Sequence, residues 1–257
     1  MRIAILGIGR MGSWLARDLA GEQEVAIFDV NPSQLTPFSS AKILRDLSQL
    51  KDFKPQMLIN AVSLQHTIQS FQAATPYLPA ECILCDLATI KGDLAQYYRT
   101  SGLRFVSLHP MFGPTFANVD HLQNENAVLI TESDPEGMSF FRSFFLRLKV
   151  NLYEFSFEAH DRMMAYSLSL PSILSLLFAG CVDTRAVPGT TFRKHLEVAR
   201  GLLSEDDHLL AEIIFNPHAL AKLALVTERL DYVRHLIMER NFQEAQLFFT
   251  QLRQSLE

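Results

Sequence analysis

A glycine-rich run near the start of the chain is the first candidate for chemistry. It reads G-x-G-x-x-G and consists of Gly7, Ile8, Gly9, Arg10, Met11 and Gly12. The run follows the apolar segment 2–6 and opens a helical pattern, the context in which such glycines permit a tight turn, close approach of a pyrophosphate and close packing of helix on strand. Phosphates would then lie at the helix N-terminus, which carries partial positive charge. In this context we prefer a dinucleotide site to a simple glycine turn.

Asp29 ends the next predicted strand, 24–28. A carboxylate at this place accepts hydrogen bonds from the adenosine ribose and repels a 2′-phosphate, so it favours NAD over NADP. We expect Val62, at the end of the predicted strand 57–62, to contact the same cofactor.

His109 is the second candidate, because it directly follows the predicted strand 104–108. Ligands of open α/β sheets bind beyond the carboxyl ends of the strands. Thr89 follows the preceding strand at the same edge, so its hydroxyl could orient the imidazole. A neutral histidine suits the role of general base. From spacing alone, a His-Pro turn without a function is an equally good interpretation.

The elements that must position these residues alternate in the first part of the chain. Short apolar runs predict strands, with helical patterns between them, at residues 2–6, 24–28, 57–62, 82–87, 104–108, 127–131 and 150–155. This alternation is typical of a doubly wound, mostly parallel, Rossmann-like sheet of the α/β class. Later segments carry helical spacing only. We therefore predict a cofactor domain over 1–156 and an all-helical dimerisation and substrate domain over 157–257.

Composition excludes several classes of function. The 257 residues are 48% hydrophobic with a net charge of -5, so no basic surface predicts nucleic-acid binding. Three cysteines cannot form a disulfide framework, which favours the cytoplasm. The cysteine and histidine spacings complete no metal site.

One stretch, residues 163–182, has no charge and is long enough for a membrane span. Its serines, its central proline and the lack of flanking basic clusters favour a helix buried on all sides or in a subunit interface. A membrane span is the alternative, and we expect no membrane association.

Several runs together resemble the prephenate dehydrogenase family. They are the glycine run, Leu-Pro-Ala-Glu-Cys-Ile-Leu-Cys-Asp-Leu-Ala-Thr-Ile-Lys at 78–91, Leu-His-Pro-Met-Phe-Gly-Pro at 108–114, and His-Asp-Arg at 160–162. The resemblance implies NAD-dependent oxidative decarboxylation of prephenate to 4-hydroxyphenylpyruvate, in tyrosine biosynthesis. It further implies a homodimer formed through the helical domain.

The resemblance also assigns roles to single residues. His109 would take the proton of the substrate hydroxyl, and Thr89 would form hydrogen bonds with both His109 and this hydroxyl. His160 would be a second active-site histidine. Gly113 would be a substrate contact. An arginine of the helical domain would bind a substrate carboxylate through bidentate hydrogen bonds. Arg193 and Arg200 are the candidates, and we favour Arg193.

The chain departs from the family pattern at Ser172, where relatives carry a substrate-binding histidine. A serine carries no charge, so the choice between prephenate and arogenate stays open. The length predicts the dehydrogenase alone, without a mutase or regulatory domain. Two other interpretations remain. One is a β-hydroxyacid dehydrogenase or imine reductase that uses Lys194 or Lys222. The other is a protein that binds NAD without turnover.

Overall fold

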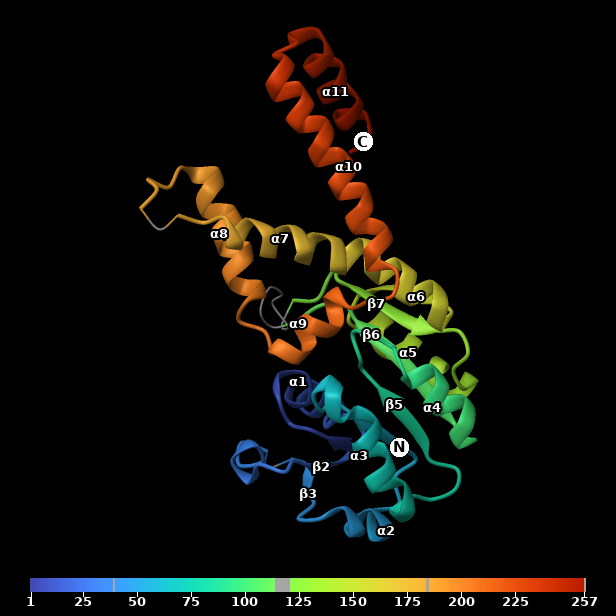
Figure 1. Ribbon diagram of the computed structural model, residues 1–257. Coiled ribbons are helices and arrows are strands. Elements are labelled where there is room, and N and C mark those ends of the chain that lie inside the picture. Colours follow the sequence, from blue (N-terminus) through green and yellow to red (C-terminus); the bar gives the residue numbers. More distant parts are fainter. Residues whose placement is uncertain (39, 114–120, 184, 257) are drawn as a thin grey trace.

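An eight-stranded sheet forms the centre of the structure, a computed structural model that describes every residue except 39, 114–120, 184 and 257 (Figure 1). The strand order is β3-β2-β1-β4-β5-β6-β7-β8. The bounds are β1 Arg2–Leu6, β2 Glu24–Phe28, β3 Lys42–Ile43, β4 Met57–Asn60, β5 Ile83–Asp86, β6 Phe105–Pro110, β7 Asn126–Ile130 and β8 Asn151–Phe155. All neighbours pair in parallel except β6 and β7, which are antiparallel. The predicted Rossmann-like, mostly parallel sheet is therefore confirmed.

Helices cover both faces of this sheet. On one face α1 (Arg10–Leu19) and α5 (Pro135–Arg147) bury Trp14, Phe141 and Phe145 against the strands. On the other face lie α2 (Leu50–Phe53), α3 (Thr67–Ala74) and α4 (Leu94–Ser101). Because both faces are covered, the strands are apolar almost throughout, which is why continuous apolar runs predicted them.

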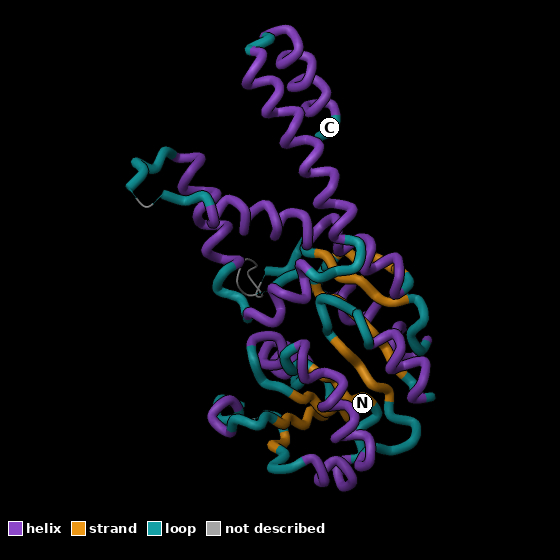
Figure 2. The backbone as a smooth tube through the Cα atoms, in the orientation of Figure 1, coloured by secondary structure: helices purple, strands orange, loops and turns teal. Residues whose placement is uncertain are grey.

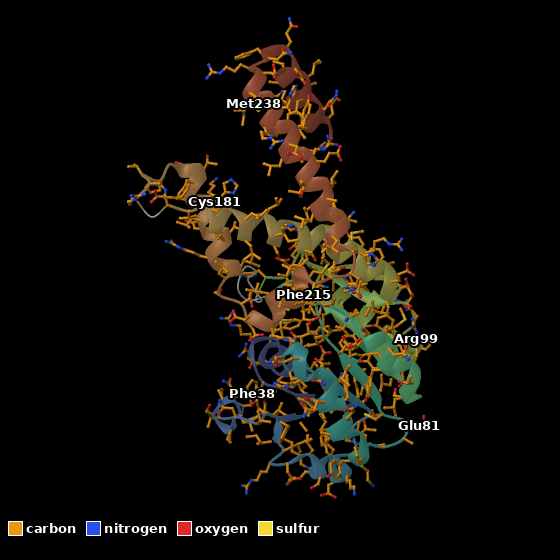
Figure 3. The ribbon with its side chains drawn as sticks, in the orientation of Figure 1. Phe38, Glu81, Arg99, Cys181, Phe215 and Met238 are labelled. Atoms are coloured by element: carbon orange, nitrogen blue, oxygen red, sulfur yellow. The ribbon has the colours of Figure 1, made fainter. Side chains whose placement is uncertain are left out.

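The remaining described elements after β8 are helices (Figure 2). They are α6 Phe157–Met164, a π-helical turn Ala165–Ser169, α7 Leu170–Gly180, α8 Thr190–Leu202, α9 Asp207–Ile214, α10 Ala219–Glu239 and α11 Phe242–Gln254. Helices α10 and α11 project from the body as an arm, on which Met238 is 73% exposed (Figures 1 and 3). We call residues 157–256 the helical region; the domain boundary at 156 stays a prediction.

The end of β6 differs from the prediction, and this difference changes the position of His109. Strand β6 does not end at Leu108 but continues through His109 to Pro110, because β7 pairs with these residues in antiparallel fashion. His109 therefore lies within a strand, opposite Val128, and not in the loop that follows it. Local sequence patterns do not reveal this pairing, because β7 is distant in sequence from His109.

The uncharged stretch forms the end of α6, the π-helical turn and all of α7. Of the described helices, Phe157–Gly180 is long and apolar enough to cross a membrane, and a bent pair, α9 with α10, passes the same test jointly. Only 22% of the apolar window of Phe157–Gly180 is buried, and Tyr166, Leu174 and Leu177 are 45–58% exposed. The expectation of a helix buried on all sides is wrong for a single chain, because α8 and α10 cover only part of its surface.

The packing of α1 on β1 yields a stability prediction. A Cβ added at Gly12 would lie 1.9 Å from the carbonyl oxygen of Gly7, whereas one added at Gly9 would meet nothing within 4 Å. We expect Gly12→Ala to lower the free energy of unfolding by about 2 kcal/mol or more. Gly9→Ala is the matched control, with an expected change below about 1 kcal/mol. Urea unfolding measures both, and equal stability of the two variants would contradict this packing argument.

Candidate functional site

The glycine run forms the turn between β1 and α1. Gly7 has φ +82°, and a Cβ there would come within 2.8 Å of the backbone of Ala61 and Val62. A side chain is therefore excluded at Gly7 by both conformation and space. The open space beside Gly9 leaves the backbone accessible at the N-terminus of α1, which begins at Arg10. This geometry suits a bound pyrophosphate.

Asp29 holds the glycine turn from the end of β2. Its Oδ2 accepts a hydrogen bond from the backbone N–H of Ile8 at 2.6 Å, and its Oδ1 accepts one from the N–H of Asn31 at 2.8 Å. Motif reasoning assigned Asp29 to a ribose and missed this second role. The carboxylate both fixes the turn and lines the adjoining cavity.

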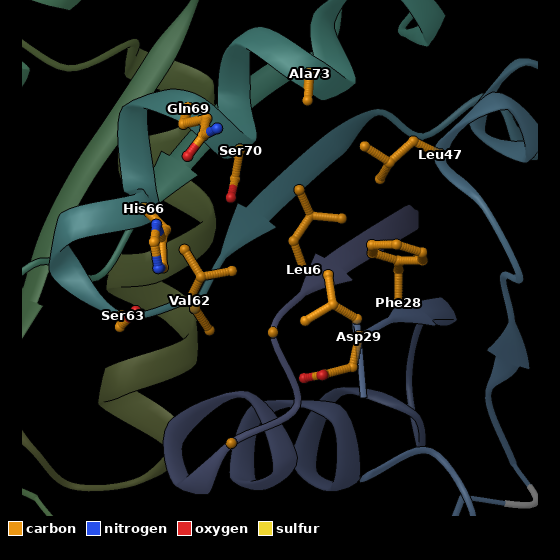
Figure 4. A pocket seen from close by; sticks show the side chains of 14 residues that line it. Leu6, Phe28, Asp29, Leu47, Val62, Ser63, His66, Gln69, Ser70 and Ala73 are labelled. Carbon is orange, nitrogen blue, oxygen red and sulfur yellow. The ribbon is translucent and has the colours of Figure 1, made fainter. Parts of the chain in front are cut away.

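Two neighbouring cavities follow the carboxyl ends of β2, β1, β4 and β5. The larger, about 610 Å³, is lined by Gly7, Gly9, Asp29 and Val62, with residues of α3 opposite (Figure 4). The smaller, about 220 Å³, is lined by Met11, Val62 and Thr89, and by Asp206 and Leu209 from α9. Ala61, Val62 and Ser63 line both. The pair spans the junction of β1 and β4, where the strand order reverses, the place where such sheets bind dinucleotides.

A chain of buried polar groups joins β6 to α6. His109 Nδ1 lies 3.1 Å from His160 Nε2, and His160 Nδ1 lies 2.9 Å from Asp161 Oδ1. His109 is 5% exposed and His160 is fully buried. The structure thus brings together two histidines that are 51 positions apart in the sequence.

These contacts determine which nitrogen of His109 can take a proton. A carboxylate only accepts, so His160 donates from Nδ1 to Asp161 and offers its Nε2 lone pair to the N–H at Nδ1 of His109. Among the described residues, this assignment leaves the lone pair at Nε2 of His109 without a hydrogen-bond donor. Neutral His109 is therefore arranged as a proton acceptor.

Electrostatics supports the neutral form of both rings. Burial, and after it the nearby His160 and Lys91, hold the pKa of His109 well below its usual value of 6.5. Burial also lowers the pKa of His160, although its hydrogen bond to Asp161 acts in the opposite direction. A base with a lowered pKa stays unprotonated at and below neutral pH.

The other expected site residues are placed differently. Thr89 lines the smaller cavity. Among the described residues, the imidazole of His109 is hydrogen-bonded to His160 and not to Thr89. Gly113 is exposed, and the following residue of its motif, Pro114, lies outside the described residues. Ser172 is buried in α7.

Both candidate arginines lie on the exposed side of α8. Arg193 is in the first turn, where its guanidinium contacts the Thr190 hydroxyl at 3.4 Å. Arg200 is in the last turn, close in sequence to Asp206 and Leu209, which line the smaller cavity. Seven residues of helix separate the two by about 10 Å. Neither arginine is among the residues that line the two cavities, so Arg193, which the sequence favours, and Arg200 both stay candidates.

The described residues contain no group of three or more His, Cys, Asp or Glu side chains placed to hold a metal. Two functional features lay outside the sequence prediction: Asp161 as the partner of His160, and the burial of Lys91 beside Asp86. Asp161 stands in the His-Asp-Arg run, so that run carried a signal for the first feature.

Comparison with known proteins agrees with this geometry. Residues 40–154 match the family described as prephenate dehydrogenase, nucleotide-binding domain. The chain is also 26% identical over 179 residues to the T-protein of Enterobacter agglomerans, an alignment that covers 66% of this chain and 46% of that protein. The chain is thus similar to the prephenate dehydrogenase family, most clearly over residues 40–154. It spans about half the length of this curated relative.

Two solved structures share the fold over nearly the whole chain. Prephenate dehydrogenase from Aquifex aeolicus, in complex with hydroxyphenyl propionate and NAD+, has a TM-score of 0.84 at 16% identity and covers 100% of this chain and 98% of its own. Arogenate dehydrogenase from Synechocystis has a TM-score of 0.79 at 21% identity, with 99% and 98% covered. The chain therefore shares the fold of these two structures over nearly its whole length.

The two hydrogen bonds of Asp29 lead to a binding prediction. Asp29→Ala frees the glycine turn and removes a ribose acceptor, so we expect NADH affinity to fall at least about ten-fold. Asp52→Ala, an exposed carboxylate on α2, is the control for net charge. Fluorescence titration with NADH measures both, and an unchanged affinity in Asp29→Ala would contradict the role of this residue.

Proposed function

We propose that the chain is an NAD-dependent prephenate dehydrogenase that converts prephenate to 4-hydroxyphenylpyruvate in tyrosine biosynthesis. The observation that carries this proposal is the buried chain His109–His160–Asp161 near the carboxyl end of β6, the edge of the sheet at which the larger cavity also lies. The match of residues 40–154 to the family model and the fold shared with a prephenate dehydrogenase support it. The lowered pKa of His109 suits removal of a hydroxyl proton.

The residues of the glycine turn fit NAD. Gly9 leaves room for a pyrophosphate, Asp29 lies where the adenosine ribose would be, and Val62 lies between the two cavities. When bound, NAD supplies the hydride acceptor. Asp29, with its negative charge, disfavours the 2′-phosphate of NADP.

His109 then removes the proton of the substrate hydroxyl through Nε2. As the imidazole becomes positively charged, His160 accepts from its Nδ1–H, and the Asp161 carboxylate stabilises the charge through His160. Loss of CO2 makes the ring aromatic and the reaction strongly downhill, so the protein has mainly to position the substrate and move one proton. The proposed substrate contacts are Thr89, Gly113, Ser172 and either Arg193 or Arg200.

Arogenate is the second candidate substrate. Ser172 is one reason for this alternative. It is buried in α7, and its uncharged side chain stands where the family pattern has a histidine. The fold shared with an arogenate dehydrogenase supports the same alternative. The deciding experiment is an NADH assay of the purified chain with prephenate and arogenate, each with NAD and NADP. Absence of turnover with all four pairs would reject the proposed function.

Substitution of His109 gives a sharper test. We expect His109→Asn to lower kcat by about 1,000-fold while NADH affinity stays within about two-fold, because the side chain acts on the proton and not on the cofactor. His195→Asn, an exposed histidine on α8, is the control. Turnover of His109→Asn close to that of the wild type would remove His109 from the role of base.

The pH dependence follows from the direction of the pKa shift. Only the neutral imidazole accepts a proton, and its pKa lies below 6.5, so activity persists as the pH falls from 7 to 6.5 and declines at lower pH. We therefore expect the acid limb of kcat/KM below pH 6.5. A limb above that value would contradict the environment described for His109.

We further propose that the chain is a cytoplasmic homodimer joined through the helical region. The exposed Leu174 and Leu177 of α7 and the apolar side chains of the α10–α11 arm support an interface, since a single chain leaves them in water. Light scattering should give twice the chain mass, and Leu177→Glu should shift it toward the monomer. Leu146→Glu, on the exposed side of α5, is the matched control. A monomeric wild type, or one that sediments with membranes, would contradict this proposal.

A further inference from the structure

Lys91 is a buried cation that the proposed reaction does not use. Its side chain is 0% exposed, and its ammonium lies 2.8 Å from Oδ1 of Asp86, which is also 0% exposed. The same ammonium donates to the carbonyl oxygen of Leu108 at 2.8 Å. Asp86 in turn accepts from the Tyr98 hydroxyl at 3.0 Å and from the backbone N–H of Ala88 at 3.0 Å.

The contact with Leu108 lies where β6 changes its pairing partner. Residues Phe105–Ser107 pair with β5 up to Asp86, and from Leu108 to Pro110 the strand pairs with β7. The ladder with β5 therefore ends just before Leu108, whose carbonyl receives Lys91 instead. Because Leu108 precedes His109 directly, this hydrogen bond fixes the backbone that carries the imidazole.

Lys91 also reaches the other end of the histidine chain. Its backbone N–H donates to Oδ1 of Asp161 at 3.4 Å, the same oxygen that holds Nδ1 of His160. Side chain and backbone of one residue thus contact both segments that carry the histidines. The positive charge of Lys91 contributes to the lowered pKa of both rings, after burial.

A buried ion pair is a poor device for stability alone. Removal of two charges from water costs several kcal/mol per ion, and a well-packed apolar pair is often as stable or more so. The position of this pair, between the ends of β5 and β6 and beside the histidines, indicates a role in the site.

We propose that Lys91, held by Asp86, is a positioning residue that fixes the end of β6 and maintains His109 as a neutral proton acceptor. The reaction it would serve rests on the proposed function. Lys91 itself does not touch the substrate. The titratable groups around it come from each element packed against it: Cys85 and Asp86 on β5, Tyr98 on α4, His109 on β6, and His160 and Asp161 on α6.

The test replaces the ion pair by a neutral pair of similar size, in the double variant Lys91→Met/Asp86→Asn. The double variant removes both charges, and of the two only that of Lys91 contributes to the lowered pKa of His109. The pH at which the His109 ring titrates should therefore rise by about one unit, measured by NMR with His109→Asn to assign the signal. The acid limb of kcat/KM should move up by the same amount. NADH affinity should stay unchanged, because the pair does not line the larger cavity.

Tyr98→Phe is the matched control. It removes one hydrogen bond from the same buried carboxylate but changes no formal charge, so the His109 titration should follow the wild type. If the ion pair had a structural role only, Lys91→Met/Asp86→Asn and Tyr98→Phe would change the His109 titration in the same way. The single variant Lys91→Met, which leaves Asp86 uncompensated, shows whether the charge of Asp86 alone unfolds the chain.

The proposal is overturned if the folded double variant titrates His109 at the wild-type pH. It is also overturned if neither Lys91 variant folds, because the pair would then be a requirement of the fold. If the wild type turns over neither prephenate nor arogenate, the proposed function fails, while the NMR titration still decides the role of Lys91.

Discussion

The hydrogen bond between His109 and His160 is the constraint on which the site depends. It joins a strand of the sheet to the first helix of the helical region, over a distance of 3.1 Å and away from water. A buried polar chain of this kind is stable only when each member has its partner. Asp161 completes the chain at one end, and at the other end Nε2 of His109 has no donor among the residues that the structure describes. The same arrangement that satisfies the buried rings therefore prepares a base.

The nucleotide cavity depends on a comparable tie between distant residues. The Asp29 carboxylate at the end of β2 receives the N–H of Ile8, so the glycine turn is fixed by the neighbouring strand as well as by its own backbone. The cavity continues past Ala61–Ser63 to Thr89 and to α9 of the helical region. A ligand that extends across the junction of β1 and β4 would thus lie with one end at Asp29 and the other at Thr89 and Leu209.

The helical region has a different character. Its first helix is packed firmly, since His160 and Met164 are buried, and Asn216 donates to the carbonyl of Asp161 at 2.8 Å. Beyond it, α7 and the α10–α11 arm expose many large apolar side chains. Solvent contact of that extent is unfavourable for a soluble monomer. This imbalance is the physical basis of the proposed dimer, in which a second copy covers the apolar stretch that looked like a membrane span in the sequence.

The local sequence pattern was sufficient to predict the glycine turn and most strands. The turn conformation requires glycine, and strands covered by helices on both faces consist of consecutive apolar residues. Strands β1 and β2 have the predicted bounds, and Gly7 and Gly12 have the roles that their spacing indicated. The short β3 and α2 went unpredicted, since two and four residues carry too little periodicity.

The residue types of the candidate site, His109, His160, Thr89 and the arginines, were also evident from the sequence and its resemblance. Their partners were not. The pairing of His109 with His160 and the hydrogen bond of buried Lys91 to Leu108 both join segments distant along the chain. The sequence by itself determined which groups are available and on which kind of element each lies. Tertiary structure alone decided which of them meet, because hydrogen bonds and burial depend on distances that only the folded chain defines.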